Sequence, residues 1–152
     1  MKATAVGDVI TAVVAALKGD VSYSVFDGPI ANPKRGEYKF LVIGGEEPFI
    51  DEAELPVSAA HMSQTWKGLG QPARDEELVI PCCAVGKAAS VSLARGMALA
   101  AVQDAFDNLG LHPTAETYNA LINEVVALES RNVPGGAVVI AKFTIMASAR
   151  LI

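Results

Sequence analysis

The segment 63–87 constrains the fold of this chain most, and its sequence is S-Q-T-W-K-G-L-G-Q-P-A-R-D-E-E-L-V-I-P-C-C-A-V-G-K. Its centre is rich in glycine and contains Pro72, which is typical of a turn because glycine accepts positive φ and proline fixes its own φ. The flanking residues 63–67 and 77–85 alternate as strands do. Pro81 interrupts the second strand and indicates a sheet edge or a bulge there. We therefore predict a long β-hairpin.

Helical and strand patterns surround this hairpin. The periodicities predict helices over residues 4–17, 90–109 and 115–130, and strands over 21–26, 38–43 and 138–151. Ser90 is placed to cap the second helix, whose predicted buried stripe is rich in alanine. This order predicts one α+β domain over residues 1–152, with a mostly antiparallel β-sheet, a long β-hairpin and helices packed on one face.

Composition allows a substantial core and indicates apolar surface. A chain of 152 residues is long enough to bury roughly 68–70% of its unfolded surface. Only 19% of the residues are charged, and the mean hydropathy is +0.34. Both values suggest that some apolar surface is covered by another subunit.

The charge distribution argues against several classes of function. The net charge is -5, and the largest basic cluster is Lys34-Arg35, whereas gripping nucleic acid needs several basic residues on one face. No apolar run approaches the roughly 18 residues of a membrane span. The first residues carry only Lys2 as a cation, and Asp8 interrupts their apolar stretch, so we expect no signal peptide and synthesis in the cytoplasm.

Cys82 and Cys83 are adjacent, a spacing that matches no zinc or redox motif. We expect both to be buried strand residues. The alternative is a small enzyme that uses one of these thiols with His61 or His112 as its base. Both thiols lie in an apolar run without a Cys-His signature, so we expect no enzymatic activity, no cofactor and no metal site.

Five carboxylates occur within nine residues in the segment 46–54. Closely spaced carboxylates can hold a divalent ion or transfer protons, but this segment lacks the ligand pattern and glycine of a calcium loop. We expect a solvated acidic loop. Its acidic residues are Glu46, Glu47, Asp51, Glu52 and Glu54.

Three features together resemble the tail terminator proteins of long, non-contractile-tailed bacteriophages. They are the strand end V-F-D-G-P at 25–29, the W-K-G-L-G at 66–70 followed by R-D-E-E-L-V-I-P-C at 74–82, and the order of elements with an alanine-rich helix and a long last strand. The resemblance implies a virion protein without catalytic residues. It would form a hexameric ring at the head-proximal end of the tail tube, stop tube polymerisation and offer a docking surface to the head connector. A head-closure or neck ring protein is the alternative from the same class.

The resemblance also implies partners and candidate surfaces. The partners would be other copies of the chain, the tail tube protein and the head-tail connector, while DNA passes through the ring without specific binding. The acidic segment would then line the lumen and repel phosphate. For the subunit or partner interface, tryptophan preference and the protruding hairpin tip suggest Trp66, Leu69, Arg74, Asp75, Glu76 and Glu77.

Overall fold

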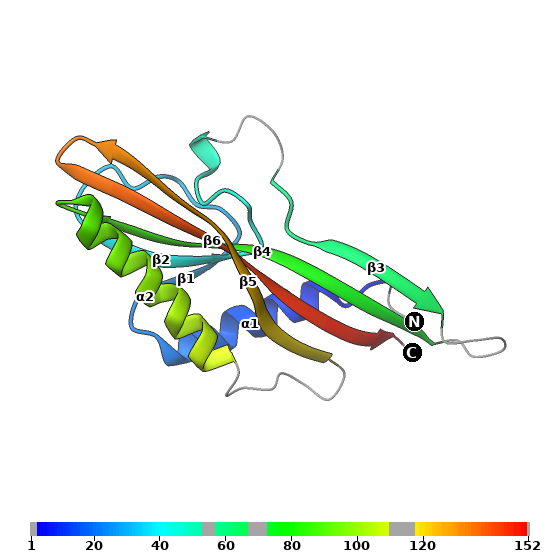
Figure 1. Cartoon of the computed structure of the whole chain (residues 1–152). Helices are drawn as coiled ribbons and strands as arrows, with labels where there is room; N and C mark the ends of the chain where they lie inside the picture. The colour runs from blue at the N-terminus through cyan, green and yellow to red at the C-terminus, as the bar shows by residue number, and fades with distance from the viewer. Residues whose placement is uncertain (1–2, 53–56, 67–72, 110–117, 152) are drawn as a thin grey trace.

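A computed structural model describes residues 3–52, 57–66, 73–109 and 118–151 of the chain. Its elements are α1 (Val6–Asp20), β1 (Ser24–Asp27), β2 (Tyr38–Ile43), a short 3-10 helix (Ile50–Glu52), β3 (His61–Trp66), β4 (Arg74–Ala88), α2 (Val91–Leu109), β5 (Tyr118–Val133) and β6 (Gly136–Leu151) (Figure 1). The strands form one sheet, and the helices contact its strands directly. The predicted α+β fold with a mostly antiparallel sheet is confirmed.

The sheet has six strands in the order β1-β2-β4-β6-β5, and β3 pairs with β4 outside this path. Only β1 and β2 are parallel; every other neighbouring pair is antiparallel. The long strands β4 and β6 pair over their whole length, from Arg74↔Leu151 to Ala88↔Ala137. They form the centre of the sheet: β2 and β3 pair with β4, β5 pairs with β6, and β1 is joined through β2.

Each side of the sheet has its own apolar cluster. On β2, Leu41 and Ile43 point into the larger cluster with α1 and α2, whereas Phe40 and Val42 point into a smaller one that contains Phe49. This alternation follows from the two-residue period of a strand. The helices therefore cover one side, as predicted, and the segment around Phe49 covers part of the other.

The helix α2 lies very close to the sheet because its buried stripe is made of small side chains. Ala94, Ala98, Ala101 and Ala105 are fully buried. The predicted cap is confirmed, since the Leu93 amide donates to the Ser90 hydroxyl oxygen at 3.3 Å.

The predicted helix over residues 115–130 is wrong where the structure describes it, because these residues belong to strand β5. Register shifts between Ile122 and Glu124 and between Val125 and Ala127 each place one extra residue in the strand. The residues that share the helix-covered side are therefore Ala120, Ile122, Val125 and Leu128, opposite Ala147, Ile145, Phe143 and Ala141 of β6. Two bulges thus convert a strand period of two into a spacing that imitates a helix.

The predicted hairpin is confirmed as β3 and β4, but Pro81 lies neither at a bulge nor on an outer strand. It lies in β4 between the residues that pair with β3, which end at Val79, and those that pair with β2, which begin at Cys82. Its carbonyl oxygen accepts from the amides of Gly44 and Gly45 at 3.0 and 2.9 Å. Since the nitrogen and carbonyl of a strand residue face the same side, the missing N–H of proline faces this gap between strands.

Candidate interaction surface

One end of the sheet extends past the start of α1 (Figure 1). We call this end the arm and define it as β3 together with residues 74–79 of β4 and 146–151 of β6. All six residues of β3 are exposed. Among them are two large apolar side chains, Met62 at 52% and Trp66 at 62% exposure. An exposed strand with such side chains is a surface suited to a partner.

Trp66 is held on the arm by a cation and does not pack on a helix. The Arg74 guanidinium carbon lies 5.3 Å from the centre of the Trp66 ring. Arg74 also donates from Nη1 to Oε1 of Gln64 at 2.8 Å. The guanidinium therefore fixes the position of an aromatic ring that faces solvent in the free chain. That Trp66 and Arg74 contact a partner stays a prediction.

Glu76 was predicted as an interface residue, but the structure places it inside the chain. Its side chain is fully buried where the arm meets α1. Its Oε1 accepts from the Ala5 amide at 2.7 Å, and its Oε2 accepts from Nε2 of Gln64 at 2.6 Å. Glu76 accepts a hydrogen bond at the start of α1, where amides lack helical partners and a negative charge is favourable.

The pKa of Glu76 follows from these contacts. Burial opposes its ionisation, but hydrogen bonds from Thr4, Gln64 and the Ala5 amide, together with the charge of Arg74, hold the pKa below its usual range. Glu76 is therefore an ionised residue of the interior that joins the arm to α1. One sequence signal does point to this position, since Glu76 shares a strand face with the apolar Leu78.

The other residues predicted for the interface have separate surroundings. Asp75 accepts from Nε of Arg150 at 3.2 Å, and both lie on the side of the sheet away from the helices. Glu77 is exposed. Leu69 lies outside the described residues.

The predicted acidic loop contains carboxylates that contact basic side chains of the same chain. Glu46 lies 3.6 Å from Nε2 of His61. Asp51 accepts from the Asn32 amide at 2.8 Å and lies 3.7 Å from Nζ of Lys34. The hydrogen bond from Asn32, with the smaller influence of Lys34, lowers the pKa of Asp51. The side chain of Glu52 and all of Glu54 lie outside the described part of the chain.

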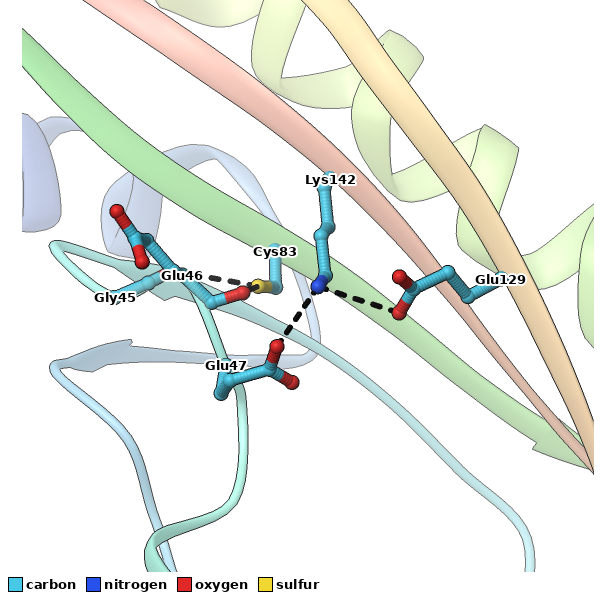
Figure 2. A network of polar contacts seen from close by, with 6 residues as sticks. All are labelled: Gly45, Glu46, Glu47, Cys83, Glu129 and Lys142. Carbon is cyan, nitrogen blue, oxygen red and sulfur yellow. Dashed lines mark hydrogen bonds and ion pairs between the residues drawn. The ribbon is translucent and has the colours of Figure 1, made fainter. Parts of the chain in front are cut away.

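Lys142 joins three parts of the fold on the side of the sheet opposite the helices (Figure 2). Its Nζ donates to Glu47 at 2.9 Å and lies 3.3 Å from Glu129. The Lys142 side chain is only 19% exposed. Burial opposes its charge, but the two carboxylates outweigh burial and raise the pKa of Lys142. Lys142 therefore ties the segment after β2 and strand β5 to β6.

A shallow pocket of about 190 Å³ lies beside this network. Its lining residues are Glu47, Glu129, Ser130, Arg131, Val138 and Ile140. Both carboxylates of the pocket pair with Lys142, so the arrangement is better suited to holding segments together than to proton transfer.

The variant Lys142→Met is expected to lower the free energy of unfolding by about 1 to 2 kcal/mol, because it leaves Glu47 and Glu129 facing each other without their shared cation. Urea unfolding at neutral pH measures this change. Lys34→Met is the matched control. Lys34 is 81% exposed and pairs with Asp51, so its loss is expected to change stability by no more than about 0.5 kcal/mol. Equal effects of the two variants would contradict the role given to Lys142.

The predicted burial of both cysteines is confirmed, with Cys82 at 1% and Cys83 at 0% exposure. The Cys83 thiol donates to the carbonyl oxygens of Gly45 and Glu46, both at 3.3 Å (Figure 2). Burial raises the pKa of Cys82 far above its usual range and that of Cys83 to about 12. Both thiols therefore stay protonated, which is unfavourable for a nucleophile. His112 lies outside the described residues.

The chain exposes large apolar side chains beyond the arm. On α2 these are Leu93, Leu99 and Phe106, and on β5 they are Val125, Val126 and Leu128. Within the described residues, no three His, Cys, Asp or Glu side chains are grouped so that they could hold a metal ion. No helix in the same part of the chain is long and apolar enough to cross a membrane.

Comparison with known proteins assigns no relative to the chain, since no family model and no curated protein matches it.

Proposed function

We propose that this chain is a structural virion protein, a phage tail terminator that forms a hexameric ring at the head-proximal end of the tail tube. There it stops tube polymerisation and provides the docking surface for the head connector. The observation that carries the proposal is the arm, in which β3 is exposed along its whole length and presents Met62 and Trp66. Such a strand is suited to an assembly in which another protein covers it.

A ring needs a contact between two different surfaces of the same chain. The arm offers one, and the exposed apolar side chains of α2, such as Leu99 and Phe106, offer another on a different element. Contacts between unlike surfaces are head-to-tail, and they close into a ring when the rotation between neighbours allows it. The distribution of exposed apolar residues therefore supports a ring former.

The state of the thiols favours a structural protein over a cysteine-dependent enzyme. Cys82 and Cys83 are buried, and their pKa values are raised. Under the proposal, replacing both with alanine leaves tube termination intact, provided that the variant folds.

The charge of the chain suits a channel for DNA. Its net charge is -5, and Glu46 and Glu47 are exposed. If these residues face the lumen, their charge repels phosphate and DNA slides without being held.

The proposal is tested by polymerising the tail tube protein of the virus that encodes this chain, with and without the purified chain. We expect the added chain to shorten the tubes in electron micrographs. Trp66→Ser is expected to abolish the shortening, whereas the matched control Ile50→Ser, which removes a side chain of similar exposure outside the arm, retains it. Unchanged tube length with the native chain, or binding only to the portal side, would overturn the proposal.

A further inference from the structure

Strand β5 is an edge of the sheet, and within the described residues it pairs only with β6 (Figure 1). After its second bulge, the segment Ala127–Val133 keeps a regular register with β6, from Ala127↔Lys142 to Val133↔Gly136. Edge strands are commonly protected by lysine, proline or a bulge. This segment contains neither lysine nor proline and begins only after the second bulge, and five of its residues in succession, 128–132, are exposed.

We propose that this segment of β5 pairs antiparallel with the same segment of a second copy of the chain, about a two-fold axis at Ser130. In this register Glu129 lies opposite Arg131 of the second copy, and Leu128 lies opposite Asn132. The sheet then continues from one copy into the other. This two-fold contact differs from the head-to-tail contact of a ring, so the inference neither requires the proposed function nor fails with it.

Charge complementarity indicates that the partner of this edge strand is a second copy of the chain, and it also selects the register of the pairing. Glu129 and Arg131 lie opposite Ile140 and Val138 of β6, and therefore point to the same side of the sheet. The two-fold axis at Ser130 brings opposite charges together twice, which stabilises cross-strand pairs. An axis moved by one residue to Glu129 or to Arg131 places like charges directly opposite each other. The alternation of faces excludes the intermediate registers, which would pair residues from opposite sides of the sheet.

Each of the two charged groups can serve more than one partner. One oxygen of Glu129 pairs with Lys142, and a carboxylate accepts several further hydrogen bonds (Figure 2). The Arg131 guanidinium carbon lies 5.8 Å from the centre of the Phe49 ring. A guanidinium carries five N–H donors, so it can serve more than one acceptor. The second copy would also cover part of Leu128, which is 45% exposed.

A cysteine at the axis tests the register directly. Cys82 and Cys83, the chain's two cysteines, are buried, so the new thiol of Ser130→Cys is the accessible one. Directly opposite residues of antiparallel strands are close enough for a disulfide. We expect mild oxidation to convert Ser130→Cys into a cross-linked dimer on a non-reducing gel. Ser92→Cys, at an exposed position on α2, is the control and is expected to form no cross-link and to run as a monomer on the same gel.

Charge reversal tests the contact in solution by sedimentation at several concentrations. We expect the native chain to dimerise, and Arg131→Glu to raise the dissociation constant at least about tenfold, because it creates two like-charge pairs. Glu129→Arg is expected to raise the dissociation constant to the same extent. In this variant Lys142 still has its ion pair with Glu47. An equimolar mixture of the two variants is expected to dimerise again, since every cross-strand pair is then opposite in charge. Circular dichroism melting checks that each variant is folded.

Three results would overturn the inference. They are a native chain that stays monomeric at every concentration, a dimer that Ser130→Cys does not cross-link, and a dimer that a folded Arg131→Glu variant leaves unchanged.

Discussion

Gly86→Ala is expected to lower the free energy of unfolding by about 3 kcal/mol, at the upper end of what overpacking costs. Gly86 lies in β4 directly beneath α2. A Cβ atom there would lie 2.5 Å from the Ala94 carbonyl oxygen, 2.9 Å from Cβ of Met97 and 3.0 Å from the Ala98 nitrogen. Two of these three atoms are backbone, so the clash is relieved only if α2 moves away from the sheet. Such a movement opens the contacts of the alanine stripe on both sides of Gly86.

Gly96→Ala is the matched control for this variant. Gly96 is an exposed position of α2 with nothing within 4 Å of the added Cβ, and alanine is the better helix former. We expect this substitution to raise the free energy of unfolding by about 0.5 to 1 kcal/mol. Thermal and urea unfolding measure the loss of stability expected for Gly86→Ala and the gain expected for Gly96→Ala. A Gly86→Ala variant as stable as the native chain would contradict the close packing of α2.

Glu76→Ala is expected to lower the free energy of unfolding by about 3 kcal/mol, because it leaves the buried Ala5 amide without its acceptor. The Ala5 amide and Nε2 of Gln64 both lose a hydrogen bond to a charged oxygen. Glu77→Ala is the control at the neighbouring, exposed position, and its effect is expected to stay within about 0.5 kcal/mol. Urea unfolding distinguishes the two, and equal losses would refute the structural role of Glu76.

The stabilisation by Glu76 is expected to depend on pH with a definite sign. Its pKa is lower in the folded chain than in the unfolded chain, so the unfolded chain binds the proton more tightly. The contribution is therefore fully present above the unfolded pKa of about 4.3 and is lost as the pH falls through the folded pKa. Glu76→Gln removes the titration. We expect its stability to fall less steeply below about pH 4 than that of the native chain.

The elements that the sequence predicts correctly are those in which a local pattern and the tertiary structure agree. From Lys142 onward, β6 alternates buried residues with more exposed ones because one of its sides faces the helices, whereas residues 137–141 are apolar and buried on both sides. The second helix combines a serine cap with an alanine stripe, and α2 has both. In these elements no bulge interrupts the period of the strand or helix.

The failures occur where tertiary structure changes the local pattern. In β5 the two bulges alter the spacing of the residues on the helix-covered side, and no single-residue signal at Asn123 or Val126 indicates a bulge. Pro81 is accommodated by a gap between two strands that come from distant parts of the sequence. Such a gap becomes visible only once the sheet is assembled.

The candidate site was predictable in part. The exposure of Trp66 agrees with its assignment to a protruding hairpin, whereas the assignment of Glu76 to the surface followed from reading the run of charges at 74–77 as one group. In a strand, neighbouring residues face opposite sides, which separates Glu76 from Glu77. The pairing of Glu47 with Lys142, 95 residues apart in the sequence, depends on the fold and has no local signal.

The most direct test of the proposed function is the number of copies of the chain bound per tail tube, measured for tubes of different lengths. Tubes assembled from the tail tube protein of the same virus are incubated with the fluorescently labelled chain, and the bound copies are counted on single tubes. The proposal predicts six copies at one end of each tube, whatever its length. Binding in proportion to tube length, or no binding, would contradict it.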